Sequence, residues 1–232
     1  MQTFKTKLSA KEEIAEKTIE FVFEKPEHFE FKAGQHVNFK LPELYYEDKK
    51  GPRRTFTVVS SPRENVLKIA TRFTGSGFKK TLLEMPVKSE LEFIGPMGEF
   101  VLNEEYPAVF IAGGIGITPF KSMLTDLEKI NFNNKIRILY SNKTINRAAY
   151  YRYFTEYKNT SLTFIPIFTG EKNWPGESRR IDYSLIKEYN KNVSGSMVYL
   201  CGPPGMVQQL TEQLQKARIS QDKIRSEAFF GY

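Results

Sequence analysis

The sequence has little of the residues on which several common kinds of site depend. It contains one cysteine, Cys201, and two histidines among 232 residues, which excludes an internal disulfide and leaves no Cys/His cluster for a metal. No window approaches the roughly 20 apolar residues of a membrane-spanning helix, because the longest candidate, residues 108–120, contains three glycines. The N-terminal segment has no apolar signal-peptide core. We therefore expect a protein of the reducing cytoplasm, with no metal and no membrane insertion.

The composition describes a globular chain with an excess of positive charge. Hydrophobic residues make up 40% and charged residues 26% of the chain, as in folded domains. The net charge of +7 admits two interpretations: a basic surface without a partner, or a surface that steers a nucleotide, an acidic protein or a nucleic acid. The lysines and arginines are scattered, and no basic block alternates with aromatics, so nucleic acid has the least support.

The first hundred residues show a two-residue rhythm. Residues 17–26, 36–42, 54–61, 66–73 and 91–96 are rich in Val, Ile, Phe and Thr, and most of these segments end near Pro or Gly. Strands at this spacing predict an antiparallel β-barrel or sandwich. Residues 78–85 have the pattern of one short helix.

From about residue 103 the pattern changes to alternating strands and helices. The apolar run 108–112 is typical of a strand buried on both faces, and a helical pattern follows at 118–130. Strands are then expected at 135–141, 162–169 and 197–202, and helices at 147–157, 183–189 and 204–217. The alternation predicts a parallel sheet covered by helices on both faces. We therefore predict two domains, an antiparallel β-barrel over residues 1–102 and an α/β parallel-sheet domain over residues 103–232.

Residues 111–120, IAGGIGITPF, look like the glycine turn of a dinucleotide-binding unit with a proline in place of the third glycine. Thr118 is expected to cap the following helix and Pro119 to be its first residue. Gly113, Gly114 and Gly116 leave backbone N–H groups bare at a helix N-terminus, which is an anion site. A tight strand–helix turn that binds nothing is the alternative.

Three further segments carry signals of the same kind. VYLCGPPGM (residues 198–206) is again a strand, a turn and a helix, and predicts a second turn at the same sheet edge, or only a rigid Pro-Pro-Gly turn. GPRRTFTVVSSP (residues 51–62) puts Arg54 and Phe56 on one strand face, which suits a phosphate and a flat ring, or is an ordinary half-buried strand. RFTGSGFKKTL (residues 72–82) is a second phosphate cradle or merely a turn.

The order of these motifs along the chain is more specific than any one of them. R-x-F-T is followed by G-S-x-F-K, G-P-x-G-x-F, G-G-I-G-I-T-P, C-G-P-P-x-M and a terminal E-A-F-F-G-Y. In this order the chain, from about Glu20 to Tyr232, resembles the ferredoxin–NADP reductase superfamily. The resemblance implies that the barrel binds FAD and that the α/β domain binds a nicotinamide dinucleotide.

For the barrel, the resemblance implies three roles in the R-T-F-T segment. Arg54 matches the arginine that holds the FAD pyrophosphate, and Thr57 the hydroxyl that reaches flavin N5. Phe56 matches an aromatic, usually tyrosine in this family, that stacks on the flavin. Because phenylalanine has no hydroxyl, any hydrogen bond that the tyrosine hydroxyl makes is lost here. The second FAD-phosphate segment comprises Gly75, Ser76, Gly77, Phe78 and Lys79.

For the other domain, the resemblance assigns the glycine turns and the C-terminus. The turn with Gly114, Gly116 and Thr118 matches the one that receives the pyrophosphate and amide of the nicotinamide nucleotide. The segment against the nicotinamide comprises Cys201, Gly202 and Pro203. The tail with Glu227, Phe229, Phe230 and Tyr232 matches a carboxylate and an aromatic that border the flavin, and spacing does not decide which of the three aromatics covers it. Thr57, Cys201 and Glu227 are thus the expected catalytic residues.

The choice between the two nicotinamide dinucleotides is partly readable from the sequence. In a dinucleotide fold an acid at the end of the second strand favours NAD. Here Ser141, Asn142 and Lys143 occupy that position, and a hydroxyl with a cation suits a 2′-phosphate. The sequence therefore favours NADPH.

Together these observations predict an FAD-dependent oxidoreductase. It would pass hydride between NADPH and flavin, and single electrons between flavin and an acidic carrier of the ferredoxin or flavodoxin type. Three alternatives stay open: a nicotinamide-dependent dehydrogenase without flavin, a reductase subunit or electron-relay module of a larger complex, and an NADH-dependent flavin reductase. The sequence offers the first of these no convincing His–Asp pair for acid–base catalysis.

Overall fold

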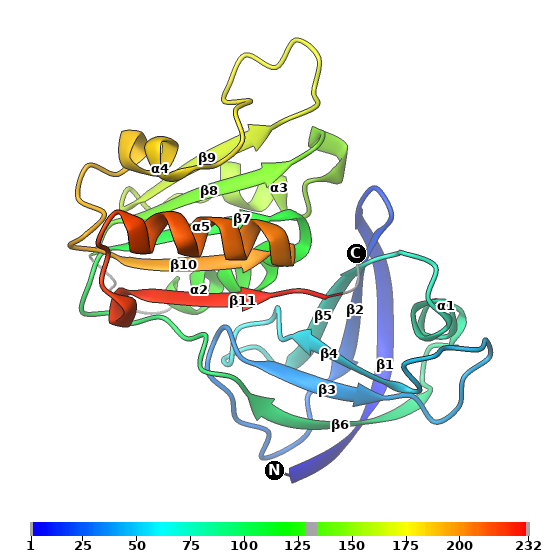
Figure 1. Cartoon of the computed structure of the whole chain (residues 1–232). Coiled ribbons are helices and arrows are strands. Elements are labelled where there is room, and N and C mark those ends of the chain that lie inside the picture. Colours follow the sequence, from blue (N-terminus) through cyan, green and yellow to red (C-terminus); the bar gives the residue numbers. More distant parts are fainter. Residues whose placement is uncertain (1, 129–133, 231–232) are drawn as a thin grey trace. The chain divides into compact units, whose positions relative to one another are not determined.

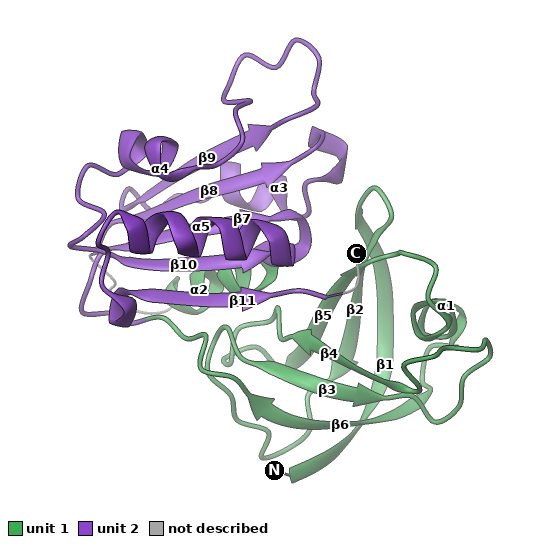
Figure 2. Cartoon of the chain, viewed as in Figure 1, with its two compact units in different colours: residues 1–102, 118–130 green, residues 103–117, 131–232 purple. Residues whose placement is uncertain are grey.

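A computed structural model describes residues 2–128 and 134–230. The chain forms two compact units (Figure 2), the first made of residues 1–102 and 118–130 and the second of residues 103–117 and 131–232. The first unit thus contains residues on both sides of the domain boundary predicted at residue 102. That boundary stays a prediction.

The first unit is an antiparallel sheet, as predicted from the two-residue rhythm. Its described strands are β1 (Gln2–Ala15), β2 (Thr18–Glu24), β3 (His36–Lys40), β4 (Arg53–Thr57), β5 (Val66–Arg72) and β6 (Glu90–Met97), in the order β4-β3-β6-β1-β2-β5. Beyond the end of β4, the Val59 N–H donates to the carbonyl of Lys68 in β5 at 2.8 Å. This bond joins the two ends of the sheet, so the sheet curls into a barrel.

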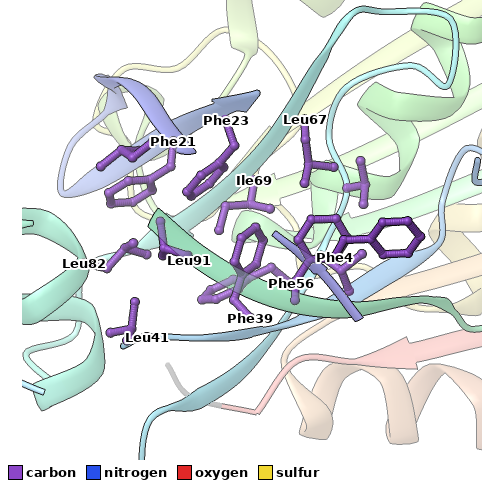
Figure 3. Packing of buried hydrophobic residues seen from close by; sticks show 14 of the residues in the cluster. Phe4, Phe21, Phe23, Phe39, Leu41, Phe56, Leu67, Ile69, Leu82 and Leu91 are labelled. Atoms are coloured by element: carbon purple, nitrogen blue, oxygen red, sulfur yellow. The ribbon is translucent and has the colours of Figure 1, made fainter. Parts of the chain in front are cut away.

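Phenylalanines fill the barrel (Figure 3). Phe29 meets Phe93 edge to face with ring centroids 4.9 Å apart, and Phe23 lies 4.8 Å from Phe39. Helix α1 (Gly77–Glu84) adds Phe78 and the apolar residues of its last turn to the same core. Such aromatic packing is close and directional, and it fixes the strand ends and the first turn of α1.

Helix α2 (Thr118–Leu127) completes the first unit, although it follows the first strand of the second unit in the chain. Ser122 Oγ donates to the carbonyl of Ser60 at 2.7 Å. Asp126 Oδ1 accepts from Ser61 Oγ at 2.9 Å and from Arg63 Nε at 3.1 Å. The segment after β4 is therefore held by a helix that is distant in sequence.

The second unit is a parallel sheet in which strands alternate with helices (Figure 1). Its described strands are β7 (Ala108–Gly113), β8 (Ile136–Asn142), β9 (Leu162–Phe168), β10 (Met197–Gly202) and β11 (Ile224–Ala228), in the order β11-β10-β7-β8-β9. All neighbouring pairs are parallel. The predicted fold class, an antiparallel barrel followed by an α/β parallel-sheet region, is therefore confirmed.

Both faces of the parallel sheet carry helices. Leu139 of β8 belongs to the apolar core that contains residues of α4 (Tyr183–Tyr189) and α5 (Pro204–Lys216). Tyr140, the next residue, points to the opposite face, where its ring lies 6.4 Å from Phe154 of α3 (Tyr151–Thr155).

Two expectations about these elements are wrong. The helix expected at 147–157 is instead a 3₁₀ turn, η2 (Ile145–Arg147), followed by the short helix α3. Tyr150 has φ +58°, a left-handed conformation that a continuous right-handed helix excludes. The C-terminal segment, expected only as a tail, contains the parallel edge strand β11. Among the described residues, no helix is both long and apolar enough for a membrane crossing.

Candidate cofactor-binding sites

The two FAD-phosphate segments expected in the barrel come together in the first unit. The guanidinium of Arg54 lies 5.2 Å from the ring centroid of Phe78. Its Nη1 donates to the carbonyl of Gly51 at 3.0 Å and to that of Lys50 at 3.2 Å. Its Nη2 forms an ion pair with Asp48. The R-T-F-T strand and the first turn of α1 thus form one cluster.

The N-terminus of α1 has the features of an anion site. Gly75 has φ +81°, which favours glycine, and the Ser76 side chain accepts a hydrogen bond from the N–H of Lys79. A Cβ on Gly77 would lie 2.3 Å from the carbonyl oxygen of Glu47, so only glycine fits there. The free N–H groups of a first helical turn attract negative charge. The sequence of this segment is therefore set by backbone geometry at the turn.

Positive charge is concentrated beside this turn. Burial and, to a smaller extent, the nearby cations Arg54, Arg72 and Lys50 together lower the pKa of Lys79 to about 8. The Lys79 ammonium donates to the carbonyl of Arg72 at 2.7 Å and to Thr74 Oγ1 at 3.2 Å. An anion bound beside cations that surround a partly buried ammonium would offset their mutual repulsion. A diphosphate fits this cluster.

Thr57 and Phe56 lie on opposite faces of β4 and have different surroundings. The Thr57 side chain is buried, with the residue 4% exposed, and its Oγ1 has no hydrogen-bond partner among the described residues. A buried hydroxyl without a partner is costly, and a ligand with a ring nitrogen would satisfy it. This orphaned oxygen fits the expected bond to a flavin.

Phe56 is a core residue with little of its ring exposed. It is 9% exposed and lies among the core side chains (Figure 3), with its ring 6.3 Å from that of Phe39 and 5.9 Å from that of Phe78. Alternation places Phe56 on the face of β4 that points into the barrel. Its contact with a flavin stays a prediction, limited to whatever part of the ring reaches the surface.

In the second unit, the two glycine turns lie side by side at the carboxyl ends of β7 and β10. A Cβ on Gly113 would lie 2.7 Å from Pro203 Cδ, and one on Gly116 would lie 2.3 Å from the carbonyl oxygen of Cys201. A Cβ on Gly202, at φ +154°, would lie 3.0 Å from the Cα and the N of Gly113. The strand order reverses between β7 and β10, and such a switch point is where open α/β sheets bind ligands.

The turn after β7 differs in detail from the expectation. Gly114, at φ +54°, begins a 3₁₀ turn, η1 (Gly114–Ile117), that runs directly into α2. Thr118 is therefore the first residue of α2 rather than its cap, and Pro119 is the second residue, because η1 leaves no extended residue between turn and helix. Binding of a pyrophosphate by Gly114, Gly116 and Thr118 stays a prediction.

Cys201 and Glu227 are register partners on the parallel strands β10 and β11. The cysteine is fully buried, and burial, with a further contribution from the Glu227 charge, raises the pKa of its thiol. A neutral buried thiol shapes a pocket but does not act as a nucleophile. The Phe229 N–H donates to the carbonyl of Gly202 at 2.9 Å, which ties the C-terminal segment to the glycine turn. Tyr232 lies outside the described residues.

The end of β8 carries a residue whose importance the sequence did not reveal. Asn142 is buried, and neither its Oδ1 nor its Nδ2 has a partner among the described residues. It follows Ser141 and precedes Lys143, whose carbonyl accepts from Gly170 N–H at 2.8 Å. An unsatisfied buried amide at the carboxyl edge of an open parallel sheet is a candidate ligand contact. Asn142 stands out because its side chain is buried, and an asparagine in the sequence does not by itself indicate burial.

Glu171 lies close to the same edge: its carboxylate accepts from the Ile145 N–H at 2.8 Å. The side chain of Arg179, later in the chain, forms ion pairs with the carboxylates of Glu177 and Glu188.

Within residues 2–128 and 134–230, no group of His, Cys, Asp or Glu side chains has the arrangement of a metal site.

Comparison with known proteins decides the family. Residues 5–102 match the family described as "Oxidoreductase FAD-binding domain", and residues 110–212 match "Oxidoreductase NAD-binding domain". The fold is similar to that of a ferredoxin NADP+ reductase from Neisseria gonorrhoeae solved with bound FAD and NADP, with a TM-score of 0.84 and 21% identity over 99% of this chain and 100% of that one. The chain belongs to the ferredoxin–NADP reductase superfamily.

Curated relatives within this superfamily are longer than the chain. The phenol hydroxylase P5 protein of Acinetobacter pittii is 26% identical over 188 residues, which are 76% of this chain and 53% of that protein. The anthranilate 1,2-dioxygenase electron transfer component of Acinetobacter baylyi is 29% identical over 183 residues, again 76% and 53%. The chain therefore spans about half the length of these relatives.

The residues described above fit the cofactors of the superfamily. The orphaned Thr57 hydroxyl and the cations around α1 suit FAD. The paired glycine turns suit a nicotinamide dinucleotide. The two family matches thus divide the chain into one region of the FAD-binding kind and one of the NAD-binding kind.

Proposed function

We propose that the chain is a flavoprotein reductase that takes hydride from NADPH onto FAD and delivers electrons singly to a carrier protein. The observation that carries the proposal is the cluster of Arg54, Lys79 and the N-terminus of α1. These groups come from two segments of the barrel and leave an excess of positive charge where a dinucleotide diphosphate is expected. Such a cluster has no evident role in a dehydrogenase without flavin.

The side chains would divide the work as follows. Arg54 and Lys79 hold the FAD diphosphate, together with the turn at Gly75, Ser76, Gly77 and Phe78. The Thr57 hydroxyl donates to the flavin ring and satisfies its own hydrogen-bonding need. The bound flavin supplies the redox chemistry, since it accepts a hydride and releases electrons one at a time.

The second unit would receive the nicotinamide dinucleotide at the switch point between β7 and β10. Gly114, Gly116 and Thr118 take the pyrophosphate, and Cys201, Gly202 and Pro203 line the nicotinamide. Glu227 and Phe229 border the flavin, with Glu227 as the group that could hold a proton. The protein's contribution is to place the two rings, because hydride transfer depends steeply on distance and alignment.

For the dinucleotide we propose NADPH, with NADH as a second candidate. Ser141 and Lys143 stand at the end of β8 where an acid would mark NAD. The Glu171 carboxylate, bonded to the Ile145 N–H beside this edge, favours the second candidate, because it would repel a 2′-phosphate. The two cofactors are to be compared directly.

For the partner we propose an acidic one-electron carrier of the ferredoxin or flavodoxin type in the cytoplasm. The net charge of +7 supports it, since an excess of positive charge steers anionic proteins. The length of the relatives supports an alternative, in which this chain corresponds to the reductase part of a larger electron-transfer assembly.

The test is the visible absorption spectrum of the purified protein after FAD is supplied, followed by anaerobic addition of NADPH and, separately, NADH. We expect a bound-flavin spectrum that bleaches at least several-fold faster with NADPH. Equal or faster bleaching with NADH would make NADH the substrate. A protein that takes up no flavin would contradict the proposed function.

A further inference from the structure

The loop between β3 and β4 brings a carboxylate to the groups proposed to hold the FAD diphosphate. Asp48 forms an ion pair with Arg54 Nη2, and its Oδ2 accepts from the backbone N–H of Phe78 at 2.8 Å. Its Oδ1 also accepts from the Lys50 N–H at 2.9 Å. The Asp48 side chain is 6% exposed. A buried acid thus occupies donors of both phosphate segments.

The loop that carries Asp48 is fixed to α1 at several points. The Tyr45 N–H donates to Thr81 Oγ1 at 2.9 Å, and the Tyr46 hydroxyl donates to the Glu84 carboxylate at 2.8 Å. The Glu47 carbonyl lies so close to Gly77 that a Cβ there would clash. Asp48 is therefore held against the helix N-terminus by its neighbours and not by its own charge alone.

The charge of Asp48 is fully developed in this position. Burial alone would raise its pKa, but the N–H groups of Phe78 and Lys50 and the Arg54 guanidinium outweigh burial and lower that pKa below its usual range. Asp48 is thus an anion at neutral pH. It stands where a first-turn N–H and an arginine fork would otherwise meet a phosphate.

Two roles are compatible with an acid beside a phosphate-binding arginine. A positioning residue would hold the arginine by one edge and leave its other donors free for the ligand. In Arg54, by contrast, Nη2 forms an ion pair with Asp48, and Nη1 donates hydrogen bonds to the carbonyls of Gly51 and Lys50. All three partners belong to the same loop. The Phe78 N–H is also used. Both terminal nitrogens of the fork and a first-turn donor are therefore engaged by the loop.

We propose that Asp48 is an internal anion that competes with the FAD diphosphate and so sets the affinity of the protein for FAD. The proposal rests on the proposed function of the barrel as an FAD site. Like charges a few Å apart near a protein surface repel strongly, so Asp48 opposes the diphosphate if the loop stays in place. If the loop withdraws, binding has to break the ion pair of Asp48 with Arg54 and its bond to the Phe78 N–H. The ion pair neutralises Arg54 until the ligand replaces it.

The test compares the wild-type protein with Asp48→Asn, which keeps the shape and removes the charge. Dissociation constants are measured from flavin fluorescence for FAD, FMN and riboflavin. We expect Asp48→Asn to bind FAD about tenfold more tightly, or ~1.4 kcal/mol, to bind FMN more tightly by a smaller factor, and to leave riboflavin, which has no phosphate, unchanged. Glu47→Gln removes an exposed carboxylate from the same loop and should change none of the three.

Each outcome bears on the proposal. Weaker FAD binding by Asp48→Asn would show that Asp48 positions Arg54, and equal tightening for riboflavin would show a general change of the site; either result overturns the competition. If Asp48→Asn unfolds at a lower temperature, Asp48→Ser repeats the comparison with a second neutral residue. Failure of the wild-type and variant proteins alike to bind FAD would overturn the proposed function and this inference together, whereas FAD binding unaffected by the substitution would overturn this inference alone.

Discussion

At the scale of single residues, the charge on Lys79 depends on what binds beside it. Its pKa is about 8 in the folded protein against about 10.4 in an unfolded chain. Between these two pH values Lys79 is protonated in the unfolded state more than in the folded state, so the free energy of unfolding rises with pH. Below about pH 8 both states carry the charge, and the cost of burying it is fully present. A bound anion would offset this cost by stabilising the charged ammonium.

FAD binding should therefore weaken as the pH rises through about 8. We expect the FAD dissociation constant to increase several-fold between about pH 7 and pH 9.5, because the free protein loses the Lys79 charge over this range. Isothermal titration in buffers of different ionisation enthalpy should show proton uptake on binding near pH 8.5. Lys79→Gln should remove the pH dependence and Lys80→Gln should keep it. A pH-independent affinity in the wild-type protein would contradict the role of Lys79.

At the scale of elements, the site in the second unit depends on how closely the turn after β7 approaches β10. Gly116 packs on the carbonyl of Cys201, where a Cβ would lie 2.3 Å from the oxygen. The obstructing oxygen belongs to the backbone, which cannot move aside as a flexible side chain does. The glycine thus serves the packing of the sheet edge itself, before any ligand is considered.

Gly116→Ala should destabilise the protein by roughly 1–3 kcal/mol, because overpacking against backbone forces the turn and strand apart. The measurement is thermal or urea unfolding followed by circular dichroism. Gly205→Ala in α5 is the matched control, since a Cβ there meets no atom within 4 Å. Its stability should be unchanged or slightly higher, because alanine favours a helix. Similar losses in the two variants would remove the argument from close approach.

The elements also show what could be predicted from the sequence. β7 and β10 are continuous apolar runs that end in glycine, so their type and their common sheet edge could be predicted. β1 could not, because its second half is polar and its strand conformation depends on pairing with β2 and β6. β11 has one strongly buried residue, Ile224, and is a strand because it pairs with β10.

The candidate site was predictable to a similar degree. Arg54, Thr57 and the segment from Gly75 to Lys79 could be named because the order of their motifs resembles that of the ferredoxin–NADP reductase superfamily. The burial of Phe56 and the contact between Asp48 and Arg54 could not be predicted. Both depend on which loop packs on α1, and local sequence does not specify that.

At the scale of the whole molecule, the net charge of +7 should govern the reaction with an electron carrier. We expect the rate of electron transfer to an acidic ferredoxin to fall steeply as salt is raised from about 0.01 M to 0.5 M, because screening shortens the range of attraction. Hydride transfer from NADPH to the bound flavin, followed by stopped flow in the same buffers, should change much less. Equal salt dependence of the two steps would contradict steering of an acidic partner.

Helix α2 has a consequence for the order in which the chain becomes structured during synthesis. Its bonds to Ser60, Ser61 and Arg63 complete the first unit, yet the ribosome makes it only after the barrel strands and β7. A fragment that stops at residue 102 would leave the segment after β4 without these partners. The nascent barrel would reach its final form late, once β7 and α2 had emerged.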